Sequence, residues 1–195
     1  MNQTLNYYNE NAVAFCEDTL KADMSHLYAC FLQHIPMGGK ILDLGCGSGR
    51  DSLEFIRKGY EVEATDGSSE LCRIASELIG QQVRCLDFEE LDYEEEFDGV
   101  WACASLLHVE KSQMMSVIDK IHRALIPGGC MYFSFKRGES ERMKNGRFFN
   151  DYTEDAARGL FTAENSWEIL DIFITGDVRD GRSEEQWVNG VVRKV

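Results

Sequence analysis

The chain has 195 residues, 44% of them hydrophobic, with 34 acidic against 20 basic residues and a formal net charge of −14. A chain of this size and composition can bury a sizeable core, which excludes a disordered protein and favours a single domain over residues 1–195. The negative charge repels phosphate backbones, and no apolar run is long enough to cross a bilayer, so neither nucleic acid nor a membrane is an expected partner.

The seven cysteines are scattered through the chain. Their odd number and the lack of Cys-x-x-Cys pairs argue against a disulfide framework and against a structural zinc site. The first residues also lack the basic and then apolar pattern of a signal peptide. We therefore expect reduced thiols, a cytoplasmic location and no bound metal.

The first 37 residues are expected to be helical. One helix is predicted over residues 10–20, with its apolar residues 13–15 facing inward, and helical spacing of apolar side chains predicts a second over 24–35. We expect residues 1–37 to form a helical cap or lid on the domain.

Residues 40–66 are the most informative stretch. An apolar run at 41–44 has the length and branching of a buried parallel strand, and it leads into a glycine-rich turn at 45–49. A helix and a second strand follow, and the strand ends at Asp66. Elements in this order bring backbone close to a nucleotide and a carboxylate to its ribose. A dinucleotide fingerprint would have its third glycine where this chain has Arg50, which disfavours NAD.

Strands and helices are expected to alternate as far as residue 136. The later predictions are helices at 69–79, 112–125 and from 153, strands at 82–86, 97–104, 130–136, 167–175 and 186–194, and a polar, basic loop at 137–147. Alternation predicts a parallel sheet, whereas the last two strands are too close in sequence for a crossover and should pair antiparallel. We therefore predict an α/β three-layer sandwich, with a mostly parallel seven-stranded sheet, an antiparallel last strand and helices on both faces.

Five short motifs make residues 38–136 resemble the class I S-adenosylmethionine-dependent methyltransferases, which have a Rossmann-like fold. The motifs are Ile41-Leu42-Asp43-Leu44-Gly45-Cys46-Gly47-Ser48-Gly49, Asp66-Gly67-Ser68, Cys85-Leu86-Asp87-Phe88, Phe97-Asp98-Gly99-Val100-Trp101 and Leu125-Ile126-Pro127-Gly128-Gly129. Within this family, the segment Gly49-Arg50-Asp51-Ser52, followed by Gly59-Tyr60-x-Val62, looks most like small bacterial members of the tellurite-resistance-like, small-molecule type.

The resemblance implies that S-adenosylmethionine is the cofactor. Gly45, Cys46 and Gly47 would line its methionine and ribose through their backbone, and Asp66 would accept hydrogen bonds from both ribose hydroxyls. The full set of cofactor contacts that the resemblance implies is Tyr8, Asp43, Gly45, Cys46, Gly47, Arg50, Asp66, Gly67, Ser68, Leu86, Asp87, Phe88, Ala102, Cys103 and Ala104.

The adenine would lie beside Gly67 and Ser68, with its amino group donating to Asp87 and either Leu86 or Phe88 against the ring. Asp87 precedes an acidic run, so a surface acid is the alternative interpretation.

Asp43 and Arg50 also have two interpretations each. Asp43 occupies the place of a family acid near the methionyl amino group, or it caps the turn. Arg50 pairs with the cofactor carboxylate, or it ties down the loop. Residues 102–104 end the fourth strand, where family members pass the methyl group to the acceptor.

His108, just beyond the fourth strand, is the candidate catalytic residue, as a base or as a group that orients the acceptor. The alternative is a core histidine bonded to a backbone carbonyl. Tyr7 and Tyr8 belong either to a lid or to a frayed terminus. Arg137 and Tyr152 are the further candidates for acceptor contacts, because the basic stretch 136–147 either recognises an anionic substrate or is a solvated loop.

The leading hypothesis is a methyltransferase that moves a methyl group from S-adenosylmethionine to a small-molecule acceptor by in-line displacement, as a monomer or homodimer. A non-catalytic module that binds S-adenosylmethionine or a partner on the same fold is one alternative. An NAD-binding oxidoreductase is the other.

Overall fold

The computed structural model describes residues 3–162, 166–179, 182 and 184–195. Its main sheet has seven strands in the order β3-β2-β1-β4-β5-β9-β8. The strands are β1 (Lys40–Leu44), β2 (Glu61–Asp66), β3 (Arg84–Cys85), β4 (Phe97–Ala102), β5 (Leu125–Lys136), β8 (Trp167–Gly176) and β9 (Gln186–Lys194). Only the pairings of β9 with β5 and β8 are antiparallel, which confirms the predicted sheet.

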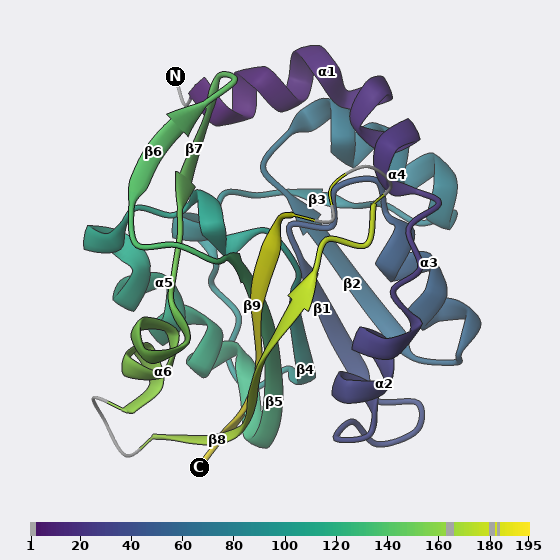
Figure 1. Cartoon of the computed structure of the whole chain (residues 1–195). Helices are drawn as coiled ribbons and strands as arrows, with labels where there is room; N and C mark the ends of the chain where they lie inside the picture. The colour runs from purple at the N-terminus through teal and green to yellow at the C-terminus, as the bar shows by residue number, and fades with distance from the viewer. Residues whose placement is uncertain (1–2, 163–165, 180–181, 183) are drawn as a thin grey trace.

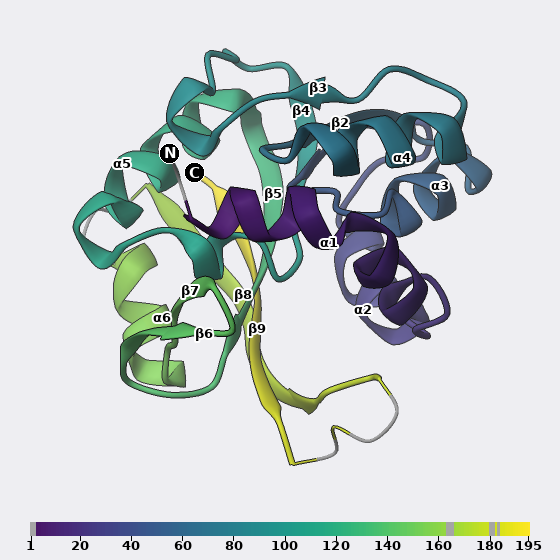
Figure 2. The same ribbon diagram turned by 90° about the horizontal axis from the view of Figure 1, so that it is seen from above.

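Helices cover both faces of this sheet (Figures 1 and 2). The helices are α1 (Gln3–Thr19), α2 (Ser25–Leu32), α3 (Arg50–Arg57), α4 (Ser69–Ile79), α5 (Lys111–Ala124) and α6 (Glu154–Thr162), with short 3₁₀ turns η1 (Phe88–Glu90) and η2 (Leu106–His108). One core packs α2 and α3 against Trp101 and Tyr132, whose rings stack at 3.9 Å. The other core packs α5 and α6 against the opposite face, around residues such as Phe133.

The register of the central strands decides where a ligand can bind. Asp43 of β1 lies level with Ala64 of β2 and with Trp101 of β4, so these three parallel strands end at one edge. The chain leaves that edge through the glycine turn, through Asp66 and through the segment after Ala102. In an open parallel sheet this carboxyl edge is the position of ligand sites.

Helix α1 differs from the prediction. It starts at Gln3 instead of residue 10, bends at Asn11 and crosses above the carboxyl edge of the sheet (Figure 2). Val13 is 63% exposed, and Ala14 is exposed as well, so the inward-facing side predicted for them is wrong. Three successive residues cannot share one face of a helix, and the buried positions are Ala12, Cys16 and Thr19, at helical spacing.

Residues 137–147 are not the loop that the sequence predicted. They contain β6 (Glu141–Lys144) and the start of β7 (Arg147–Asn150), which pair as an antiparallel hairpin. Asn145 and Gly146 form the turn, with φ values of 52° and 78°. Two successive positive φ values define the tight hairpin turn that Asn-Gly favours, so the sequence did contain the signal for this correction.

Three strand boundaries also differ from the prediction. The predicted strand 82–86 shortens to Arg84–Cys85, while β5 extends back to Leu125, through the Pro-Gly-Gly segment. Strand β4 stops at Ala102.

None of the helices in the described ranges has the length and apolarity that a bilayer crossing requires.

Candidate functional site

A cavity of about 450 Å³ opens at the carboxyl edge of the sheet. This volume lies within the usual range of small-molecule sites. The glycine turn, the ends of β2 and β4, helix α1 and the β6–β7 hairpin all contribute to its wall. Thirteen of the predicted site residues line it, namely Tyr8, Gly45, Cys46, Gly47, Arg50, Asp66, Gly67, Leu86, Asp87, Phe88, Cys103, Ala104 and His108.

The glycine turn is held against the end of β2. The N–H groups of Gly45 and Cys46 both donate to the Thr65 carbonyl at 2.9 Å. Gly45 has φ +79°, and a Cβ on it would lie 2.5 Å from the Cβ of Ser105. A side chain at this position would therefore collide with the segment that follows β4, which explains the need for glycine.

Asp66 is the centre of the polar wall. Its carboxylate accepts from the Gly47 N–H at 2.9 Å and from the Ser68 N–H at 2.8 Å. A carboxylate has about four acceptor positions, so Asp66 keeps capacity to accept from hydroxyl groups in the cavity. Burial raises the pKa of Asp66, while the backbone N–H groups lower it.

The far side of the cavity is a small apolar platform with one acid. Leu86 and Phe88 line it together with Asp87, which caps η1 by accepting from the Phe88 N–H at 2.8 Å. Ser68 is buried behind this wall, where it caps α4 and donates to Asn9 at 2.7 Å. Ser68 therefore contributes to the site through its backbone and its hold on α1.

Asp43 and Ala102 lie behind the wall. The Asp43 carboxylate is buried and accepts from the Ser52 hydroxyl at 2.6 Å, which ties β1 to α3. Burial, and then the neighbouring charge of Asp51, raise the pKa of Asp43. Asp43 therefore holds β1 to α3 and does not line the cavity.

Arg50 and Asp51 form a buried ion pair in the floor of the cavity. Arg50 donates to both Asp51 oxygens, at 2.6 and 3.0 Å, and to the Thr19 carbonyl at the end of α1. Asp51 also accepts from Tyr28 at 2.6 Å and from Trp101 at 2.9 Å. Burial works against ionisation of Asp51, but Arg50 and these donors bring its pKa below the ordinary value. The pair therefore ties the loop down, and Asp51 is a wall residue that the sequence reasoning missed.

His108 has both ring nitrogens occupied. Nδ1 lies 2.6 Å from the Phe148 carbonyl, which can only accept, so Nδ1 carries the proton. Nε2 then accepts from the Tyr8 hydroxyl at 2.8 Å. Burial lowers the pKa of His108 to about 4, with a further contribution from Arg147. The ring is neutral at pH 7, and its bond to a backbone carbonyl is the alternative that the sequence left open.

Helix α1 and the β6–β7 hairpin close over the cavity together, and we call this pair the clasp. The hairpin rises beside the start of α1 in Figure 1. The Phe148 N–H donates to the Thr4 hydroxyl at 2.9 Å, and the Arg147 guanidinium lies 4.6 Å from the centre of the Tyr7 ring. Tyr7 and Tyr8 are thus parts of an ordered helix, although only Tyr8 lines the cavity.

Two predicted acceptor contacts lie elsewhere. Arg137 points away from the cavity, where it forms an ion pair with Glu154 at 3.6 Å. Tyr152 is buried against Phe135, with ring centres 4.4 Å apart. Arg137 and Tyr152 flank the β6–β7 hairpin, which replaces the expected loop. The residue that this hairpin brings to the cavity wall is Arg147.

A cluster of charged side chains lines the end of the cavity beside β5 and β9. Lys136 forms an ion pair with Glu185 and lies 4.7 Å from the centre of the Trp187 ring. Burial lowers the pKa of Lys136 to about 8. Arg179 forms an ion pair with the buried Asp177. Of these residues only Lys136 fell in the basic stretch, because Trp187 belongs to β9 and the others come from the turn that joins β8 to β9.

Within the described ranges, no three His, Cys, Asp or Glu side chains form a group that could hold a metal ion. The sheet order, the glycine turn after β1 and the acid that ends β2 define a nucleotide-binding α/β protein of the Rossmann-like type.

The comparisons with known proteins refine this class. The family described as "Methyltransferase domain" matches residues 41–129. A putative methyltransferase of Bacillus subtilis, YqeM, is 31% identical over 54% of this chain, and an uncharacterized methyltransferase of Synechocystis is 30% identical over 70%. The chain spans 47% and 62% of the lengths of these two relatives.

A solved structure adds the fold. The 1,6-didemethyltoxoflavin N1-methyltransferase of Burkholderia thailandensis, with bound 1,6-didemethyltoxoflavin and S-adenosylhomocysteine, aligns with a TM-score of 0.77 and 23% identity. The alignment covers 98% of this chain and 85% of that one. Fold, motifs and relatives all match the class I S-adenosylmethionine-dependent methyltransferases.

Proposed function

We propose that the protein transfers a methyl group from S-adenosylmethionine to a small-molecule acceptor. The observation that carries this proposal is the Asp66 carboxylate, which lines the cavity beside the glycine turn and keeps acceptor capacity beyond its backbone partners. A carboxylate in this position suits the hydroxyls of a ribose. The cavity of about 450 Å³ and its cover by the clasp favour a small acceptor over a macromolecule.

The other cofactor contacts follow from the same geometry. Leu86 and Phe88 would hold the adenine ring, with Asp87 accepting from its amino group, while the backbone of Gly45 to Gly47 would follow the methionine. Cys103 and Ala104 line the cavity after β4, so we place the reacting methyl beside them. When bound, S-adenosylmethionine supplies an electrophilic methyl group on sulfur.

The chain's own contribution is alignment and the exclusion of water. Phe15 of α1 covers the glycine turn, since a Cβ on Gly47 would lie 3.1 Å from its ring. Tyr8 covers His108 from the same helix. Holding the acceptor in line with the methyl group and away from water provides a large part of the rate enhancement in such a reaction.

His108 is the residue that we propose as proton acceptor when the acceptor carries a proton. Its Nε2 lone pair is accessible only when the Tyr8 hydroxyl moves aside, because that hydroxyl occupies it in this structure. A thiolate or another anionic nucleophile needs no base, and His108 would then act only by holding Tyr8. A cytoplasmic location and a monomeric or homodimeric state remain predictions.

Calorimetric titration with S-adenosylhomocysteine and with NAD tests the cofactor. We expect binding and a rise in Tm with S-adenosylhomocysteine and neither with NAD; binding of NAD alone would establish the oxidoreductase alternative. A second assay follows S-adenosylhomocysteine formation with a panel of thiols, amines, phenols and carboxylic acids. Cofactor binding without turnover on any of them would favour the non-catalytic module.

A further inference from the structure

Arg147 is a cation in the cavity wall whose partners are aromatic. Its guanidinium lies 4.6 Å from the centre of the Tyr7 ring, 5.7 Å from that of Tyr8 and 5.2 Å from that of Phe149. The Nε atom is buried and has no hydrogen-bond partner among the described residues. Since Nε is buried, the terminal N–H groups of the guanidinium, which lines the cavity, are the ones positioned to bind an acceptor oxygen.

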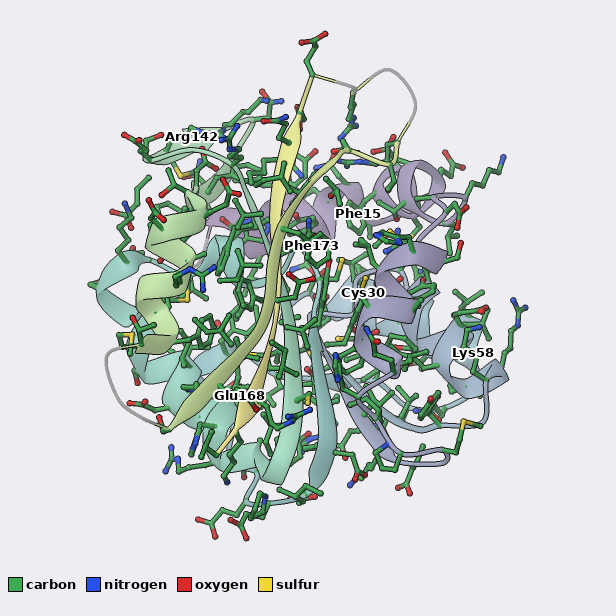
Figure 3. All side chains as sticks on the ribbon, turned by 60° about the horizontal axis from the view of Figure 1, so that its bottom comes forward. Phe15, Cys30, Lys58, Arg142, Glu168 and Phe173 are labelled. Atoms are coloured by element: carbon green, nitrogen blue, oxygen red, sulfur yellow. The ribbon has the colours of Figure 1, made fainter. Side chains whose placement is uncertain are left out.

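Arg142, on the other strand of the same hairpin, provides an internal contrast. It also stacks on Phe149, at 5.1 Å, but it donates to both oxygens of the buried Asp151, at 2.7 and 3.1 Å. Figure 3 shows Arg142 at the edge of the molecule, and it does not line the cavity. The fold therefore supplies a carboxylate for the outer arginine of the hairpin, while no acidic side chain of the described ranges forms an ion pair with Arg147.

The other cations on this side of the cavity all have an acidic partner. Lys136 and Lys144 share Glu185, and Arg50 is bonded to Asp51. The neighbours of Arg147 are neutral, because His108 carries one proton and burial raises the pKa of Tyr8. Arg147 therefore differs from these cations in having no acidic partner within the described ranges, and it lines the cavity.

We propose that Arg147 binds a carboxylate group of the methyl acceptor, which makes the substrate a small carboxylic acid. A guanidinium donates two parallel N–H groups to one carboxylate. Arg147 contacts Tyr8 and lies near His108, so the carboxylate would be held next to the segment after β4. This inference rests on the proposed function, and it names the substrate class of that same cavity.

The test uses the full chain saturated with S-adenosylhomocysteine and two probes of equal shape, benzoate and benzamide. The variants are Arg147→Met, Arg147→Lys and, as matched control, Lys144→Met, which removes a cation whose side chain is 51% exposed in the same hairpin. Affinity for S-adenosylhomocysteine and the Tm are measured first for every variant. Benzoate and benzamide binding is then measured by calorimetric titration.

We expect the wild-type protein and Lys144→Met to bind benzoate at least about tenfold more tightly than benzamide, the effect of one charge-assisted pair. Arg147→Met should lose this preference, and Arg147→Lys should keep only part of it, because an ammonium group lacks the two-pronged geometry. Affinity for S-adenosylhomocysteine should stay within about twofold in all variants.

Equal binding of benzoate and benzamide by the wild-type protein would overturn the inference, as would an unchanged benzoate preference in Arg147→Met. It would also be overturned if Lys144→Met lost the benzoate preference as fully as Arg147→Met, or if the wild-type protein bound phenyl phosphate more tightly than benzoate. A large loss of S-adenosylhomocysteine affinity in Arg147→Met would also overturn it, because Arg147 would then bind the cofactor. A wild-type protein that binds the cofactor and benzoate but transfers no methyl group would instead contradict the proposed function.

Discussion

The glycine-turn side of the cavity and the clasp are built differently. The glycine-turn side comes from one continuous stretch, residues 40–66, and is held by buried groups such as the Arg50–Asp51 ion pair. The clasp joins α1 to a hairpin more than a hundred residues later. Its part-buried hydrogen bonds include Phe148 N–H to Thr4 and a link through His108, which is bonded both to Tyr8 and to the Phe148 carbonyl. A rigid, preformed surface suits a cofactor that every turnover uses, whereas a cover with few contacts can open for the acceptor.

The largest expected effect concerns the rigid side. Asp51→Asn removes the charge that Arg50, Tyr28 and Trp101 share and leaves a buried guanidinium without its counter-ion. We expect the free energy of unfolding, measured by urea denaturation, to fall by about 3–5 kcal/mol.

Glu54→Gln is the control for this change. Glu54 lies on the same helix in a surface pair with Lys58 at 3.2 Å, and its loss should cost less than about 1 kcal/mol. Equal losses in Asp51→Asn and Glu54→Gln would remove the distinction between a buried and a surface pair on this side of the cavity.

The next effect concerns the clasp and its pH dependence. The pKa of His108 is about 4 in the folded protein, against an ordinary value of 6.5. A depressed pKa means that the unfolded chain takes up the proton first, so the stabilisation is complete above about pH 6.5 and declines as pH falls through 4. The difference amounts to at most about 3 kcal/mol, reduced by the partial exposure of the ring.

Urea denaturation of the wild-type protein and of His108→Asn between pH 7 and pH 4 measures this effect. The wild-type protein should lose stability more steeply than the variant over this range. Parallel pH profiles would mean that the pKa of His108 is the same in the folded protein as in the unfolded chain, and that its ring is not buried as the structure has it.

Cofactor affinity should separate Asp66 from Asp87. Asp66→Asn weakens two hydrogen bonds to a charged acceptor, so we expect the Kd for S-adenosylhomocysteine to rise by at least about 30-fold. Asp87→Asn affects one bond at a half-exposed carboxylate, and a rise of roughly tenfold or less is expected. Calorimetric titration gives both Kd values. A larger rise in Kd for Asp87→Asn than for Asp66→Asn would mean that the main cofactor contact is on the adenine side.

The smallest effect concerns the hydrogen bond from Tyr8 to His108. Tyr8→Phe should lower the free energy of unfolding by about 1 kcal/mol and weaken S-adenosylhomocysteine binding only a few-fold. Tyr7→Phe keeps the ring beneath Arg147 and should change neither quantity measurably. A Tyr8→Phe loss as large as that of Asp66→Asn would make the clasp part of the rigid binding surface.

The strands that lead into the site were well predicted because their signals are local. The apolar run of β1, the glycine turn and the acid at the end of β2 lie within 27 residues, and the spacing alone places Asp66 beside Gly47. Helix α4 was predicted at its observed bounds, because both its capping serine and its terminal glycine are in the sequence.

The clasp could not be predicted in the same way. The contact of Tyr8 with His108 joins residues 100 positions apart, and Arg147 faces the cavity only because Asn145 and Gly146 turn the chain into a hairpin. Tyr152 and Arg137 were expected at the acceptor and lie outside the cavity for the same reason. Sequence spacing says nothing about which face of such a hairpin meets a distant helix.

The amino-acid sequence by itself determined the sheet, the position of the glycine turn and the resemblance to the methyltransferase family, because these depend on residues close together in the chain and on the periodicity of single elements. Only the tertiary structure decided that Asp43 supports the floor while Asp51 lines it, and that His108 is neutral and bonded to Tyr8. It also decided that Arg147, and not Arg142, faces the ligand. Burial and charge pairing arise when separate elements pack, and they decide which of several similar side chains keeps an unsatisfied group for a substrate.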